Sequence, residues 1–191
     1  LGFFGVDTFL PLALTDIRHR STAFAGLALT AATVSWSAGS WTQAHFADKL
    51  SRRHIIRTGL SLIVVGCAGV MVTLFDDVSV FLAIPFWLIA GFGMGLAYSG
   101  TTLTVLQTAE PGKEGRATSS MQTASVLGFG FGAGIGGAWI ASLSSGDDVE
   151  RNALVFQDAL MIAVLVLAIV LVRNVPAWPG KKRDHTPEGS P

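Results

Sequence analysis

The chain has 191 residues, of which half are apolar and only 14% are charged, and it carries no net charge. A soluble domain carries about 25% charged residues, so this composition, with a mean hydropathy of +0.54, indicates a membrane protein. It also excludes the basic face that nucleic-acid binding requires. The one cysteine, Cys67, lies in an apolar run, and the four histidines fall in loops or the tail. We therefore expect no disulfide framework, no metal site and no cofactor.

Long apolar segments alternate with short polar turns, and most of them reach the ~20 residues that a membrane-spanning helix needs. The pattern predicts an all-α membrane protein, a bundle of six transmembrane helices within residues 1–175. The expected helices cover about residues 1–17, 21–46, 54–75, 80–108, 117–143 and 153–173. Residues 176–191 are rich in proline and charge, which predicts a disordered tail. Because the first apolar run is short and has no charged leader, we expect the later part of a longer protein.

The first segment contains a carboxylate, Asp7, among apolar neighbours. An ionisable side chain at that depth is costly and is typical of a functional site, so Asp7 is the candidate for binding a proton or a cationic substrate. The alternative is that Asp7 lies among the lipid headgroups at the end of a shortened helix. Both interpretations remain open at this stage.

The second and fourth segments combine small residues with aromatic and hydroxyl side chains. Small residues let helices approach closely in lipid. The alternating Gly91, Gly93 and Gly95 do not form a stripe on one helix face, so we expect thin packing and some flexibility there. A lipophilic ligand would contact aromatic and hydroxyl side chains, and the candidates are Phe3, Phe4, Trp36, Tyr98 and Thr101.

The fifth segment is rich in glycine, and Gly132–Gly137 satisfies the nucleotide-binding spacing G-x-G-x-x-G. A nucleotide site would need this motif between a strand and a helix, whereas here it lies inside a membrane-length segment. We therefore expect close helix packing through Gly128, Gly132, Gly136 and Gly137. The sixth segment is unbroken hydrocarbon after Asp158.

The lysines and arginines predict how the chain is threaded through the membrane, because loops rich in them stay cytoplasmic. Ten of the thirteen fall in the 44–57 turn, the 109–116 turn and the tail, which all lie on one side. We therefore expect a multi-pass protein of the cell membrane with these segments in the cytoplasm. The remaining three are Arg18, Arg20 and Arg151, and the loop with Arg18 and Arg20 fits this arrangement least well.

The turn Ala44–Arg53 resembles a cytoplasmic loop motif of the major facilitator superfamily, Gly-x-Leu-Ala-Asp-Arg-x-Gly-Arg-Arg. In that family the motif joins the second and third helices of each six-helix half, which is its place here. Alanine and serine replace the two glycines, while one acid and three cations are kept, namely Asp48, Lys49, Arg52 and Arg53. The resemblance implies that Asp48 pairs with neighbouring helix ends and that the cations latch the two halves together at the cytoplasmic side.

A second stretch, Gly132–Gly137, is similar to the Gly-Pro-x-x-Gly-Gly motif of antiporters in this family, with Ala133 in place of the proline. The arginine motif of the family's fourth helix is not matched, because Trp87 stands at the arginine position. The resemblance covers nearly the whole chain and implies the C-terminal half of a drug:proton antiporter with twelve or fourteen helices. In such a half, the first and fourth helices line the cavity, the second and fifth contact the other half, and the third and sixth face lipid.

These observations predict one half of a secondary transporter, which exports small lipophilic molecules in exchange for protons by alternating access. Its partners would be the small-molecule substrate, protons, the lipid bilayer, and the missing N-terminal half or a second copy. The alternative is a truncated, non-transporting membrane module that acts as a scaffold. An enzyme is not expected, because the membrane segments show neither a pair of carboxylates nor a histidine-containing catalytic set.

Overall fold

The computed structural model describes residues 2–47, 49–143 and 147–175, and the regular structure within these ranges is helical. An 11-residue helix, α1, continues into a wider π-helical turn, η1, and longer helices follow it. The elements are α1 (Gly2–Leu12), η1 (Ala13–Ile17), α2 (Thr22–Phe46), α3 (Arg52–Val72), η2 (Val80–Leu82), α4 (Ala83–Thr108), α5 (Glu114–Leu143), α6 (Asp147–Leu171) and η3 (Val172–Asn174). The all-α fold predicted from the apolar segments is confirmed.

The helix ends follow local chemistry, and three helices, α3, α5 and α6, begin earlier than the apolar pattern indicates. Ser21 precedes α2, and its hydroxyl accepts a hydrogen bond from the Phe24 N–H at 3.3 Å. The α4–α5 turn contains Gly112 with φ of +82°, a conformation that glycine adopts without strain. α5 then begins at Glu114, because an acidic side chain is favourable in the first turn of a helix. α6 likewise begins at Asp147, in a polar turn that precedes its apolar part.

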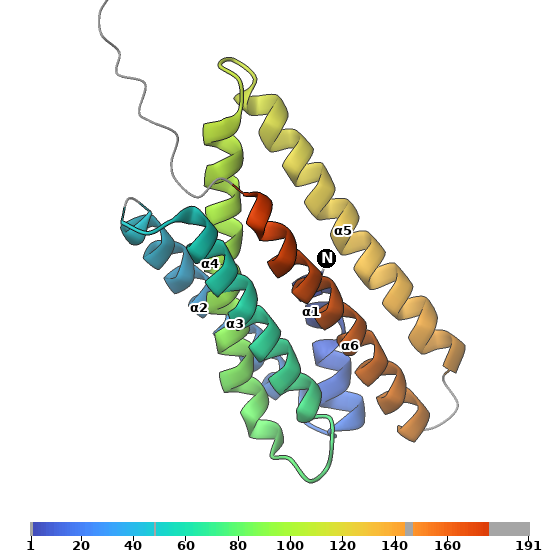
Figure 1. Cartoon of the computed structure of the whole chain (residues 1–191). Coiled ribbons are helices and arrows are strands. Elements are labelled where there is room, and N and C mark those ends of the chain that lie inside the picture. Colours follow the sequence, from blue (N-terminus) through green and yellow to red (C-terminus); the bar gives the residue numbers. More distant parts are fainter. Residues whose placement is uncertain (1, 48, 144–146, 176–191) are drawn as a thin grey trace, which may run out of the picture.

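Four of the described helical segments are long and apolar enough to cross a membrane. They are Arg52–Val72, Val80–Thr108, Glu114–Ser142 and Arg151–Asn174. α1 is shorter than a span, and α2 carries more hydroxyl and other polar side chains along its 25 residues. Both pack in the same bundle as the four spans, with α1 beside only part of the length of α6 (Figure 1).

α4 lies between α2 and α3, and its alternating glycines make this possible. A Cβ on Gly91 would collide with the Ala32 carbonyl of α2, and one on Gly93 would lie 2.5 Å from the Gly59 carbonyl oxygen of α3. Gly95 again faces α2. The period of two therefore serves two opposite helix faces. The expected thin packing is present, but it is close packing with backbone on both sides rather than a source of flexibility.

α6 packs against α1 and α3, while α5 lies at the edge of the bundle against α6, α1 and α4 (Figure 1). Gly2 and Gly5 of α1 face α6, where an added Cβ would lie 2.5 Å from Leu165 Cγ and 2.5 Å from Met161 Sδ respectively. The largest buried side chain is Trp87 of α4. The core therefore lies among α1, α2, α3, α4 and α6, and α5 covers it from one side only.

An ion cluster joins two connections and the start of α6 at one end of the bundle. Asp76, after α3, accepts from Arg18 Nη1 at 2.6 Å and from Arg151 Nη1 at 3.0 Å. Arg18 Nη2 also donates to the Val78 carbonyl oxygen at 2.9 Å. The guanidinium of Arg20 lies over the Phe81 ring, 5.1 Å from its centroid. The three arginines outside the predicted cytoplasmic side thus all have partners at their own end, which explains why this side tolerates them.

Candidate functional site

Five aromatic side chains from four helices form one continuous cluster, which we call the aromatic wall. Its members are Phe3 and Phe4 of α1, Trp36 of α2, Tyr98 of α4 and Phe129 of α5. Trp36 lies at its centre, with ring-centroid distances of 5.9 Å to Phe3, 6.1 Å to Phe4 and 5.9 Å to Tyr98. Phe129 meets Phe4 edge to face at 5.7 Å. Four of these residues were predicted as ligand contacts, and the fold brings them together from positions up to 95 residues apart.

Trp87 extends the wall into the core. Its side chain is fully buried and stacks on Phe3, with centroids 5.0 Å apart and the rings 4° from parallel. Within the described part of the chain, its indole N–H has no hydrogen-bond partner. An unsatisfied buried donor is unfavourable, so a hydrogen-bond acceptor beside the Trp87 N–H would be stabilising.

Asp7 is the carboxylate nearest to that donor along α1. It lies one helical turn beyond Phe3, is half-buried, and is close enough to Trp87 for the two side chains to interact, although no hydrogen bond of good geometry closes between them. The structure thus places Asp7 beside the aromatic wall. The role of Trp87 was missed in the sequence, where the residue was noted only for occupying the place of an arginine. A tryptophan deep in an apolar segment is itself a signal, because its N–H needs a partner.

Hydroxyl groups contribute unequally to this site. The Tyr98 hydroxyl donates to Gln122 Oε1 at 2.8 Å and so links α4 to α5. Thr101 is exposed, and its hydroxyl donates to the Ala97 carbonyl oxygen of its own helix at 2.7 Å. Its described contacts do not connect Thr101 to the aromatic wall.

The predicted gating loop is described except for Asp48, which lies outside the described residues. Lys49 lies over the Phe46 ring at 5.7 Å, and Arg53 donates from Nε and Nη2 to the Val175 carbonyl oxygen at 3.2 and 2.9 Å. Arg52 is only 4% exposed, and its Nε finds no hydrogen-bond partner among the described residues. Two of these cations therefore have contacts within this half, while Arg52 keeps a donor available.

The predicted packing glycines of α5 line the side that faces α1 and α6. Gly132 and Gly136 are buried, whereas Gly128 and Gly137 are partly exposed. A Cβ on Gly136 would lie 2.5 Å from Phe9 Cε2 and 2.6 Å from Gln157 Nε2, and the Gly132 carbonyl accepts from Gln157 Nε2 at 3.4 Å. By contrast, nothing lies within 4 Å of a Cβ placed on Gly130 or Gly134.

Two polar residues of α6 are buried that the sequence analysis did not select. Gln157 is 1% exposed and Asp158 is 5% exposed. The signal was present, because both interrupt an otherwise apolar run, but a position near the start of the segment suggested a solvated end. Helix α6 in fact begins at Asp147, so these residues lie three turns inside it.

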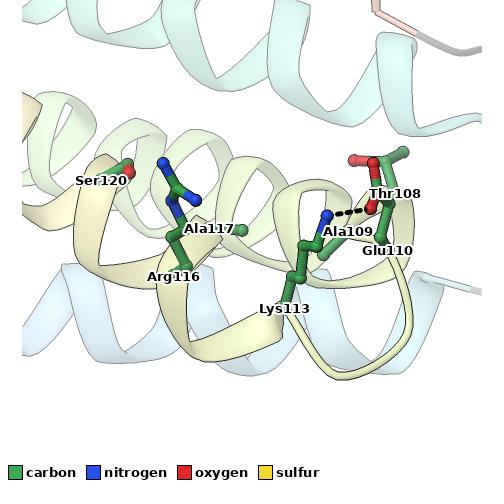
Figure 2. Close-up of a pocket in the computed structure, with 7 residues that line it drawn as sticks. All are labelled: Thr108, Ala109, Glu110, Lys113, Arg116, Ala117 and Ser120. Atoms are coloured by element: carbon green, nitrogen blue, oxygen red, sulfur yellow. Dashed lines mark hydrogen bonds and ion pairs between the residues drawn. The ribbon is translucent and has the colours of Figure 1, made fainter.

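Two cavities lie away from the aromatic wall. One, of about 350 Å³, lies at the α4–α5 turn, where Arg116 extends beside an ion pair between Lys113 and Glu110 at 2.5 Å (Figure 2). The other, of about 290 Å³, is an apolar hollow between α2, α3 and α4. Neither is lined by Asp7 or Trp36. Among the described residues, no group of histidine, cysteine and acidic side chains could hold a metal ion.

Comparison with known proteins relates this geometry to a family. The family model described as Major Facilitator Superfamily matches residues 1–191. The "Probable multidrug-efflux transporter Rv1634" of Mycobacterium tuberculosis is 25% identical over 168 residues, which cover 85% of this chain and 36% of the relative. The "Multidrug transporter protein MdtP" of Bacillus subtilis is 29% identical over 160 residues, covering 84% of this chain and 29% of the relative. The chain thus spans about a third of the length of these curated relatives.

Solved structures agree on the fold. The xylose transporter XylE from E. coli, in a partially occluded inward-open conformation, superposes with a TM-score of 0.74 at 16% identity, over 92% of this chain and 47% of that one. Its inward-open conformation gives a TM-score of 0.69 at 20% identity, over 93% and 46%. The helical bundle therefore corresponds to half of such a transporter. With the family match along its whole length, the chain belongs to the Major Facilitator Superfamily.

Proposed function

We propose that this chain is the C-terminal half of a transporter that exports small lipophilic molecules in exchange for protons. The observation that carries the proposal is the meeting of Asp7, the unpartnered Trp87 N–H and the aromatic wall at one place. The multidrug transporters among the relatives support the choice of substrate class.

The aromatic wall suits a lipophilic ligand. Flat rings offer apolar area and specific edge and face contacts, which accommodate ligands of varied shape. Trp36 and Phe4 are only partly buried within this half, so their rings keep surface for a ligand. The ring of Phe129, on the loosely covered helix α5, is 44% exposed.

Asp7 would couple ligand and proton by electrostatics. A carboxylate in apolar surroundings favours its neutral, protonated form, whereas a nearby cation or entering water favours the ionised form. Binding of a cationic ligand would therefore displace the proton, and opening the site to the other side would exchange the two again. The Trp87 N–H stabilises the ionised state by offering a hydrogen bond to the carboxylate oxygen.

The partner in our proposal is the other half of the transporter. α2 and α5 carry large apolar side chains that no other described helix covers, and a surface of this kind marks an interaction site or a lipid contact. The most exposed are Leu27, Val34 and Trp41 on α2 and Val126, Phe131 and Ile135 on α5. The XylE structures contain about twice the length of chain that this half matches, which supports a second half as the occupant of part of this surface.

The cation-rich loop after α2 would be cytoplasmic and would act as a latch. Arg52 is buried, yet its Nε is without a partner in the described residues, and a charged group in that position gains from an acceptor on the other half. Asp48, Lys49 and Arg53 would complete the latch, as the motif resemblance implies.

The test is Asp7→Asn in the intact transporter, reconstituted in vesicles with an imposed proton gradient. Substrate efflux driven by the gradient should fall at least tenfold, while binding of a neutral lipophilic ligand changes little. The matched control is Asp16→Asn, because Asp16 is an exposed carboxylate near the other end of the same segment. Gradient-driven efflux that is equal in Asp7→Asn and the parent would refute the proposed role. The 191-residue chain alone should bind ligand weakly and transport nothing; transport by it would show that the other half is dispensable.

A further inference from the structure

Asp158 is a buried carboxyl for which the function proposed above has no use. It lies on α6 within the segment Arg151–Asn174, which has the highest mean hydropathy of the four spans, 2.7. Its side chain is 5% exposed, and it receives no hydrogen bond or ion pair from the described residues. Its neighbours one turn away on α6, Leu154 and Met161, are also buried in apolar clusters.

The charged and titratable groups around Asp158 do not supply a counter-charge. α6 packs against α1, α3, α5 and η1. From α3 the Cys67 thiol lies within electrostatic range of Asp158, and Asp7 of α1 is also within range of that thiol. α5 presents glycines and Ile140 to α6. Arg18, after η1, and Arg151, on α6 itself, pair with Asp76 at the end of the bundle.

Such surroundings decide which protonation state Asp158 can have. An ionised carboxylate that is buried without a partner costs many kcal/mol, so the group takes up a proton instead. The surroundings of Asp158 therefore favour its protonated form.

Next to Asp158, Gln157 links α6 to α5 through a weak polar contact. Its amide is inserted between α1 and α5, 2.6 Å from the Cβ position of Gly136, and its hydrogen bond to the Gly132 carbonyl is long, at 3.4 Å. α5 is the helix that the bundle holds most loosely (Figure 1). A shift of α5 away from α6 would break this contact. Asp158 lies about 100° further round the helix, within electrostatic range of Cys67 on α3, so its contact with water also requires α6 to separate from α3.

We propose that Asp158 is a second proton-carrying residue of the transporter, separate from Asp7, which exchanges its proton with water when the helices packed against α6 move apart in the transport cycle. The carboxyl O–H bond breaks with the proton passing to water, and it forms again from water on the opposite side of the membrane. Each cycle then moves one proton more than Asp7 alone would carry. This inference rests on the proposed function for the transport cycle, but not for the protonation state.

The first experiment reads the proton directly. The intact transporter, reconstituted in lipid nanodiscs at neutral pH, is compared with Asp158→Asn by infrared difference spectroscopy in the region of protonated carboxyl groups. The variant should lose one protonated-carboxyl band, whereas Asp16→Asn should lose none, because Asp16 is exposed. An unchanged carboxyl band in Asp158→Asn would overturn the proposal, whatever happens in transport.

The second experiment counts protons per transported substrate in vesicles. The ratio should fall by one in Asp158→Asn and should be restored in Asp158→Glu. A lost infrared band with an unchanged ratio also overturns the proposal, because a proton that never leaves is not carried. Should Asp158→Asn fail to fold, Asp158→Glu alone remains informative, since it should shift the pH midpoint of the band. Failure of the proposed function is distinguishable, because the parent protein would then show no proton coupling while the infrared result would stand.

Discussion

Helices α4 and α5 are both rich in glycine, yet their glycines meet opposite surroundings. In α4, Gly91 and Gly95 admit the backbone of α2, and Gly93 admits that of α3. In α5, a Cβ on Gly130 or Gly134 would meet nothing within 4 Å. These glycines of α4 therefore lie in close helix–helix contacts, whereas Gly130 and Gly134 of α5 lie on an open surface.

The difference shows that the two sides of this half are packed to different degrees. Its α2–α4 and α3–α4 contacts are close, because the helix backbones approach each other at the three glycines of α4 and leave no room there for a Cβ. Its α5 side is held through one buried glycine face, a long Gln157 hydrogen bond and the Tyr98–Gln122 contact. Packing density in lipid depends on close approach of small residues, so α4 is packed tightly on two faces, whereas α5 leaves one face uncovered by the described helices.

The largest effect should follow from Gly95→Ala. The added Cβ would lie 2.6 Å from the Ser40 backbone nitrogen and would also collide with the Trp36 carbonyl. Backbone cannot move aside as a flexible side chain can, so we expect a loss of about 3 kcal/mol of stability, at the upper end of overpacking costs. Thermal unfolding of the purified chain in detergent measures it.

The matched control for that substitution is Gly134→Ala. Because its Cβ enters open space and alanine favours helix by about 1 kcal/mol over glycine, its midpoint should stay the same or rise slightly. If the two substitutions destabilise the bundle equally, the contrast between the two helices is not real.

The next effect is functional and concerns the open glycine nearest the aromatic wall. Gly130→Leu should leave the stability of this half unchanged, but should weaken its contact with the other half and reduce transport by the intact protein about tenfold, equivalent to about 1.4 kcal/mol. Ser61→Leu adds similar bulk on the exposed face of α3 and should transport normally. Normal transport by Gly130→Leu would mean that this face of α5 contacts only lipid.

The smallest effect tests the polar link between α2 and α4. The Ser35 hydroxyl donates to the Leu88 carbonyl oxygen at 2.8 Å, whereas that of Ser37 donates to Thr33 of its own helix. Ser35→Ala should cost about 0.6 kcal/mol, the average for such bonds between membrane helices, and Ser37→Ala less. The unfolding midpoint of each variant, compared with that of the parent, measures the two costs. A larger cost for Ser37→Ala would contradict the assignment.

The fold was largely accessible from sequence because membrane length and polar turns leave few alternatives. The helix positions follow from that pattern, and the loop motif after α2 gave the family. The pattern does not indicate which neighbouring helix packs against each face of a helix. The alternating glycines of α4 looked incompatible with one packing stripe, and only the structure shows that two neighbours use them.

The candidate site was accessible in part. Aromatic residues and a carboxylate in apolar segments are visible as exceptions, so Phe4, Trp36 and Asp7 could be selected. Their meeting depends on helix order and rotation, which sequence alone does not fix. Asp158 was overlooked because it stands near the start of the expected apolar segment, and burial is a property of the packed bundle rather than of the segment.

The Arg18–Asp76–Arg151 cluster has a mechanical consequence. It joins two connections and the second turn of α6, which are far apart in the chain, and Asp76 itself is 77% exposed. Each ion pair contributes little free energy at such a surface, yet together they prevent the near ends of α1, α3 and α6 from spreading apart. At the opposite end Arg53 joins α3 only to the segment after α6, and the α4–α5 turn stays outside that tie. The bundle is therefore held by ion pairs at one end, while the first turns of α5 lie outside the Arg53 contact at the other.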